Sequence, residues 1–157
     1  MKITAKDIEK AIVNTYGFFA NYRNNTVVPN VSYGLCFNHE LDLCVLTKSG
    51  YIHEIEIKIS KSDLIRDAEK WHQHKDPRIR CLWFAGPYDM KEDFENYVPD
   101  GAGIILISDN PKKKTQTAKI HRKAKPKKAK KITEAENLKL LQLMILRYWT
   151  IRIKEKL

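Results

Sequence analysis

Alternation of apolar and polar residues predicts a β-hairpin in the middle of the chain. Every second residue is aliphatic over residues 41–45 and again over residues 55–59. A short turn, Lys48-Ser49-Gly50, separates the two runs. Period-2 alternation on both sides of a turn that ends in Gly is typical of antiparallel strands joined by a three-residue loop.

Helical spacing and capping residues predict elements on both sides of this hairpin. The predicted helices are one that Thr4 caps, one that Ser62 caps and that runs to about residue 75, a short one over residues 90–97, and a last one over about residues 134–154. Thr133 and Glu136 form a capping box for the last helix. The further strands are predicted at residues 31–37, 79–85 and 102–107.

This order of elements favours an α/β fold in which a mixed β-sheet is flanked by helices and followed by a long C-terminal helix. We divide the chain into a core over residues 1–109, a basic strip over residues 110–132 and the C-terminal helix over residues 133–157. No apolar run is long enough to span a membrane, and the N-terminus lacks the apolar core of a signal peptide. Three cysteines within apolar runs are typical of reduced thiols, so we expect a cytoplasmic protein.

The positive charge is concentrated in one segment. Of the 29 Lys and Arg residues, eleven lie between residues 111 and 131, where no acidic residue occurs. Such a strip either attracts a polyanion, for which DNA is the expected partner, or is a solvated linker. The candidate DNA-binding residues are Lys112, Lys113, Lys114, Lys119, Arg122, Lys123, Lys125, Lys127 and Lys128.

The hairpin carries the candidate chemistry. With the three-residue loop, Asp42 lies opposite Glu56, and Cys44 lies opposite Glu54. Two facing carboxylates repel each other, and a divalent cation such as Mg²⁺ or Mn²⁺ would relieve that repulsion. Lys58 follows on the same face, where an ammonium group can stabilise charge on an attacked phosphate.

The same alternation also describes an ordinary hairpin with one face in solvent, so these residues have a second interpretation. Glu40 opposite Lys58 forms either a cross-strand ion pair or a support for the site, and Glu54 is expected to be exposed. His39 and the cysteines lack the paired spacings of a zinc site. Basic residues at positions 66, 70 and 74 recur every four residues, which favours a solvated helix face or a phosphate contact.

An Asp, a hairpin turn and then Glu-x-Lys resembles the PD-(D/E)xK signature of the restriction-endonuclease-like nucleases. Within that superfamily, the run from Glu40 to Leu64 is similar to the MmcB-like DNA-repair nucleases and to small phage proteins related to them. The similarity covers about residues 31–108 and includes Lys70-Trp71, Leu82-Trp-Phe-Ala85 and Val98-Pro-Asp-Gly-Ala-Gly-Ile104. It implies a restriction-endonuclease-like sheet.

The resemblance also implies roles for individual residues. Asp42 and Glu56 would bind the metal, with the carbonyl of Ile57 as a third ligand, and Lys58 would be the catalytic lysine. Many members of the superfamily add a Glu from the first helix, and Glu9 is the candidate here. The chain departs from the signature at Leu41, where the motif has Pro.

These observations predict a Mg²⁺-dependent deoxyribonuclease that acts in DNA repair or phage DNA processing. The alternative is a DNA-binding accessory protein of the same fold that does not cleave, because members of the superfamily can lose catalysis and keep the fold. A third hypothesis concerns the last helix, which is apolar nearly all round. It either packs deeply on its own domain or pairs with a second chain as a homodimer.

Overall fold

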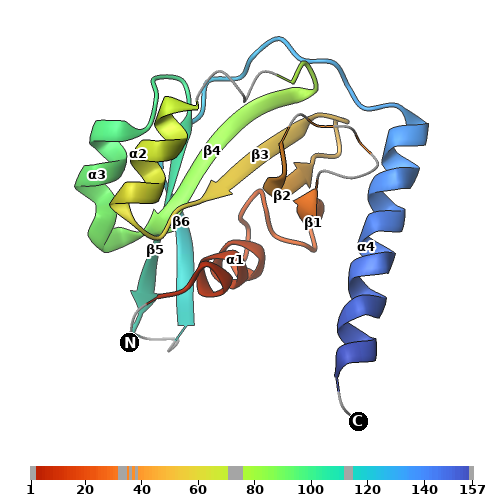
Figure 1. The fold of residues 1–157 in the computed structure, drawn as a ribbon, viewed down its shortest axis with the longest axis horizontal. Coiled ribbons are helices and arrows are strands. Elements are labelled where there is room, and N and C mark those ends of the chain that lie inside the picture. Colours follow the sequence, from red (N-terminus) through yellow and green to blue (C-terminus); the bar gives the residue numbers. More distant parts are fainter. Residues whose placement is uncertain are drawn as a thin grey trace.

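The computed structural model describes residues 3–31, 35, 37, 39–70, 76–111 and 115–155. Six strands form one mixed sheet, in the order of the sequence (Figure 1). They are β1 (Thr26–Val31), β2 (Leu41–Leu46), β3 (Ile52–Ile57), β4 (Ile79–Pro87), β5 (Gly103–Asn110) and β6 (Thr115–Arg122). β3, β4 and β5 run parallel, and the other neighbours are antiparallel.

Helices cover both faces of this sheet (Figure 1). They are α1 (Ala5–Asn14), α2 (Lys61–Glu69), the 3₁₀ turn η2 (Tyr88–Met90), α3 (Lys91–Tyr97) and α4 (Glu134–Lys154). Ile8 and Ile12 of α1 are buried in one cluster with Ile55, whereas Leu64 of α2 and Phe94 of α3 are buried on the other face. The mixed α/β sheet with flanking helices and a long C-terminal helix is therefore confirmed.

The central hairpin has the predicted register. Leu43 lies opposite Ile55, and Cys44 lies opposite Glu54. The backbone of the loop residue Gly50 has φ of 84°, a left-handed conformation that Gly adopts without the steric cost of a Cβ. The alternating pattern and the turn together were sufficient to define which side chains share a face.

The strand predicted at residues 31–37 is wrong, because β1 lies one segment earlier and ends at Val31. Leu35 and Phe37 are buried but belong to no strand, and residues 32–34 and 36 lie outside the described part of the chain. β1 is an edge strand of the sheet, where Pro29 is tolerated because one side of the strand needs no hydrogen-bond donor.

The segment of residues 110–132 contains a strand that the sequence pattern did not predict. β6 pairs antiparallel with β5, and only after Arg122 does the chain continue without helix or strand to residue 133. This extended part, residues 123–132, is the portion of the predicted strip without helix or strand, and it is called the basic strip from here on. It crosses the N-terminal ends of β3, β4 and β5 through backbone bonds from Lys125 N to Gly101 O at 2.8 Å, Lys127 N to Arg80 O at 2.8 Å and Ile132 N to Gly50 O at 3.1 Å.

Helix α2 begins earlier than predicted. Ser60, not Ser62, is the N-cap, since its side chain accepts a hydrogen bond from Asp63 N at 3.3 Å. Residues 71–75 lie outside the described part, so the predicted extension to residue 75 stays a prediction.

The capping box at Thr133 and Glu136 begins α4 as predicted. Helix α4 packs on its own domain along one side only, because within α4 only Leu140 is buried. Large apolar side chains such as Leu138 and Ile145 are more than half exposed. Among the described residues, no helix combines the length and the apolar character needed to cross a membrane.

Candidate functional site

The structure brings Asp42 and Glu56 together on neighbouring strands. Asp42 Oδ2 accepts a hydrogen bond from Ile57 N at 2.8 Å, which continues the β2–β3 pairing past Leu43 through a side chain. The negative charge of Asp42 contributes to the pKa shift of Glu56, so the two carboxyl groups interact electrostatically. Asp42 and Glu56 therefore lie on neighbouring strands within electrostatic range of each other, and a metal shared between them stays a prediction.

Lys58 lies on the same side, just beyond the end of β3. Its Nζ lies 2.9 Å from Glu56 Oε2 and 3.5 Å from Asp67 Oδ1, an α2 residue. Its backbone N donates to Ala85 O at 2.9 Å, which ties this position to β4. Gly86 permits that approach, because a Cβ there would lie 2.6 Å from Lys58 O.

Burial changes the electrostatics of this group. Burial, together with the charge of Asp42, raises the pKa of Glu56 to about 7, although Lys58 acts to lower it. Burial also raises the pKa of Asp42, against the hydrogen bond from Ile57 N. Burial acts to lower the pKa of Lys58, but Glu56 and Asp67 outweigh it, so this pKa is raised and the ammonium form is favoured.

One oxygen of the group is suited to a cation. Glu56 is 4% exposed, and its Oε1 is buried without a hydrogen-bond partner among the described residues. A buried carboxylate oxygen without a partner is costly, and a divalent cation would satisfy it. Carboxylate oxygens are ligands that suit Mg²⁺ or Mn²⁺.

A cavity of about 290 Å³ opens beside these residues. Strands β2 and β3 supply one wall, and α2 with the residue that follows it supplies the other. The lining residues are Asp42, Ile57, Lys58, Asp63, Arg66, Asp67 and Lys70. The basic side chains at positions 66 and 70 therefore lie beside the candidate site, which favours the phosphate-contact interpretation of that helix face. His74 lies outside the described residues.

Three side chains that the sequence did not assign to the site lie beside it. Asp67 contacts Lys58, and His39 Nε2 contacts Glu54 Oε1. His39, Glu54 and Glu56 each offer a ligand atom, and these atoms lie within 4.8 Å of one another. Glu54 is fully buried, so the expectation that it is exposed is wrong.

The signals for these residues were weak in the sequence. Glu54 and Glu56 share one face of β3, and that face is buried by chain segments far away in the sequence. Asp67 lies three residues after the buried Leu64, a spacing that turns it toward the sheet. No spacing relates His39 to Glu54, which are brought together only by the fold.

The supporting candidates have different positions. Glu9 is half-buried on α1, and burial raises its pKa, to which the charge of Asp42 also contributes. It therefore lies within electrostatic range of the site. Glu40 does not pair with Lys58 as one interpretation proposed, because Glu40 Oε1 instead accepts from Asn30 Nδ2 at 3.0 Å. Ile57 lines the cavity, and its role as a carbonyl ligand stays a prediction.

The candidate DNA-binding residues are separated from the cavity. The basic strip crosses the N-terminal end of β3, whereas Lys58 follows its C-terminal end. Arg122 is half-buried and donates to the carbonyls of Ala102, Val98 and Pro99, which gives it a structural role. The exposed candidates are Lys119, Lys123, Lys125, Lys127 and Lys128, while Lys112, Lys113 and Lys114 lie outside the described residues.

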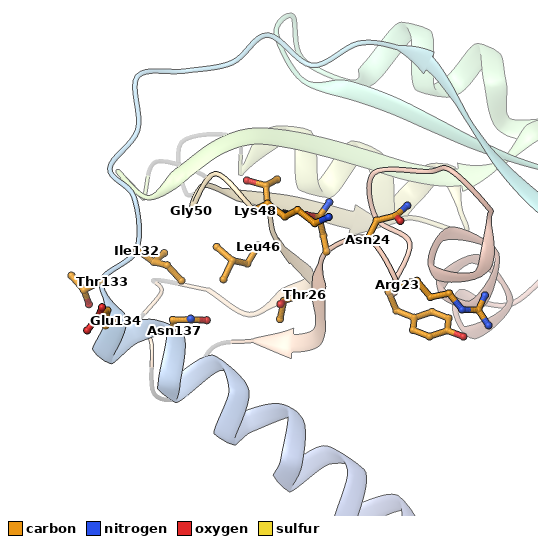
Figure 2. A pocket seen from close by; sticks show the side chains of 13 residues that line it. Arg23, Asn24, Thr26, Leu46, Lys48, Gly50, Ile132, Thr133, Glu134 and Asn137 are labelled. Atoms are coloured by element: carbon orange, nitrogen blue, oxygen red, sulfur yellow. Dashed lines mark hydrogen bonds between the residues drawn. The ribbon is translucent and has the colours of Figure 1, made fainter.

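A larger cavity, of about 550 Å³, lies at the turn end of the hairpin (Figure 2). Figure 2 shows Lys48 and Gly50 of the turn on one side and Glu134 and Asn137 of α4 on another. Glu134 is the one acidic residue among the described residues that line it. This cavity is not lined by Lys58 or by several carboxylates, as the smaller cavity is, so its size does not make it the better candidate for catalysis.

Comparison with known proteins supports the fold and adds nothing on function. The sequence matches no protein-family model and no curated protein. A solved structure of a protein of unknown function from Silicibacter pomeroyi is similar, with a TM-score of 0.69 and 14% identity over 97% of this chain and 94% of that chain. At this identity the likeness shows a shared fold over almost the whole of both chains.

Proposed function

We propose that this protein is a metal-dependent nuclease of the PD-(D/E)xK type that hydrolyses DNA phosphodiester bonds. The observation that carries the proposal is the group of Asp42, Glu56 and Lys58 at one end of a hairpin, with the buried Glu56 Oε1 suited to a cation. Arg66 and Lys70 beside the same cavity supply positive charge for a phosphate backbone.

In this proposal, Asp42 and Glu56 hold the metal, and the Ile57 carbonyl is a further ligand. A bound Mg²⁺ or Mn²⁺ supplies Lewis acidity and screens the charge of the phosphate. Lys58 stays protonated at neutral pH because Glu56 and Asp67 raise its pKa. Its ammonium group stabilises the charge that develops on the phosphate oxygens as water attacks phosphorus and the bond to the leaving oxygen breaks.

A test is cleavage of several forms of DNA by the full chain with Mg²⁺ or Mn²⁺. Replacing Lys58 by Ala removes the cation and is expected to lower the cleavage rate by roughly 100–1,000-fold. The matched control is Lys48→Ala, an exposed lysine at the other end of the same hairpin, which should cleave at the wild-type rate. Equal cleavage by wild type and Lys58→Ala would exclude the assignment.

A second candidate function is binding of DNA without cleavage. It is favoured by the basic strip and by the ion pairs that occupy Lys58 on two sides. It predicts metal-independent DNA binding that Asp42→Ala leaves unchanged, and no metal-dependent cleavage of any DNA form. The nuclease proposal predicts the reverse for cleavage.

A further inference from the structure

Helix α4 presents two faces with different surroundings. Glu136, Leu140, Leu143 and Arg147 face the domain: Glu136 pairs with Arg78 at 3.0 Å, Leu140 is fully buried and Arg147 donates to Asn30 O. Leu143 packs against the same buried cluster as Leu140. These contacts fix the rotation of the helix about its axis, so the opposite face points away from the domain (Figure 1).

The outward face repeats at alternating spacings of four and three residues. Its members are Glu134, Leu138, Leu141, Ile145, Tyr148 and Arg152. Leu138 is 61% exposed and Ile145 is 56% exposed, although both are large and apolar. A four–three repeat of apolar residues is the pattern by which one helix packs against another in a coiled coil.

We propose that a second copy of this chain covers this face, with the two α4 helices antiparallel. In that arrangement Glu134 meets Arg152, Leu138 meets Tyr148 and Leu141 meets Ile145, and each pair occurs twice through the two-fold axis. The repeat is thus apolar in its centre and has opposite charges at its two ends. Parallel helices would instead place Glu134 against Glu134 and Arg152 against Arg152.

The charges at the two ends select this partner and this direction. Glu134 lies in the first turn of α4 and is exposed, at the rim of the cavity in Figure 2. Arg152 lies in the last turn and is 54% exposed, with its Nη1 3.8 Å from Glu155 Oε2 of the same chain. Each end of the face is therefore complementary to the other end of a second copy, and mixed pairs of this kind set helix orientation.

The oligomeric state of the full chain tests the proposal. Light scattering after gel filtration and sedimentation velocity should give twice the chain mass of 18.4 kDa. Ile145→Glu places two carboxylates in the central layers and should yield monomers. Because Ile145 is exposed, the thermal unfolding temperature of the monomer form should not collapse. Tyr16→Glu, at a side chain that is 93% exposed and follows α1, is the matched control and should stay dimeric.

A charge exchange tests the antiparallel direction without touching the apolar layers. Arg152→Glu alone should weaken the dimer by about tenfold or more, since Glu134 of one chain then meets a second carboxylate. Adding Glu134→Arg should restore the dissociation constant to within about threefold. A wild-type protein that is monomeric at all concentrations, a dimer that survives Ile145→Glu, or a double exchange that fails to restore association would each overturn the proposal.

Discussion

The two ends of strand β3 hold charge in opposite ways. At the C-terminal end, Glu56 and Lys58 are mostly buried and contact each other at 2.9 Å, beside Asp42. At the N-terminal end, the basic strip is exposed and is held through its backbone, which leaves its side chains on the surface. Buried charges of both signs can position a cation and a reacting group, whereas exposed charges of one sign can only raise the local concentration of a polyanion.

The comparison predicts a large effect of charge removal on stability at the C-terminal end of β3 and almost none at the N-terminal end. Glu56→Gln removes a carboxylate that burial and Asp42 make costly to ionise, so it should raise the free energy of unfolding of the metal-free protein at pH 8. The pKa of this group rises from 4.5 unfolded to about 7 folded, which corresponds to an increase of up to about 3 kcal/mol. Chemical denaturation in the presence of EDTA measures it.

The sign of this effect follows from the protonation states. Well below pH 4.5 Glu56 is protonated in both the folded and the unfolded state and costs nothing. Between pH 4.5 and about 7 the unfolded state has lost this proton while the folded state still holds it, so wild-type stability falls over this range and levels off above it. Wild type and Glu56→Gln should therefore converge in stability at low pH.

Lys127→Ala, at the exposed end, should change stability by less than about 0.5 kcal/mol. A Gln variant that is less stable than wild type at pH 8 would contradict the account.

The sequence alone was sufficient to predict how β2 and β3 pair. The alternation at residues 41–45 and 55–59 with Gly50 in the turn set the register, and register alone decides that Asp42 and Glu56 share a face. What it missed depends on the sheet as a whole. β1 tolerates Pro29 because it is an edge strand, and Glu54 is buried by segments that no local pattern relates to it.

The last strand, β6, was not predicted because residues 111–131 were treated as one segment on account of their lysines. The β-branched residues Thr115, Thr117 and Ile120 within this segment favour a strand. The strand forms because β5 offers an unpaired edge, which is a tertiary condition. The position of the strip at the far end of β3 from Lys58 also follows from the fold and not from the sequence.

The strip is expected to govern binding and not the chemical step. Replacing Lys123, Lys125, Lys127 and Lys128 together by Ala should weaken DNA binding roughly tenfold or more, and the slope of log affinity against log salt should become shallower by about 0.9 for each phosphate that the strip no longer neutralises. Cleavage at saturating DNA should stay at the wild-type rate, because none of these residues lines the cavity beside Lys58. Fluorescence anisotropy at several salt concentrations measures the slope, and an unchanged slope would show that the strip makes no phosphate contact.

The smallest expected effect is that of replacing Arg66, a single residue beside the candidate site. Arg66 lines the cavity beside Lys58 from α2 and is 65% exposed, with Asp63 Oδ1 at 3.3 Å. An exposed ionic contact contributes about 0.2–1 kcal/mol, so Arg66→Ala should raise the KM for DNA by roughly two- to fivefold. The value of kcat should change little, because in the proposed function the guanidinium group would contact the DNA backbone near the reacting phosphate and not the phosphate that reacts.

Arg23→Ala is the matched control for this variant. Arg23 is also exposed, lines the larger cavity at the other end of the hairpin and packs its guanidinium on the Tyr22 ring at 4.9 Å. Its removal should leave both kcat and KM at the wild-type values. If Arg23→Ala raised KM as much as Arg66→Ala, the DNA would have to lie across the turn end of the hairpin. The scissile phosphate would then not bind in the cavity beside Lys58, even if Lys58 itself proved essential.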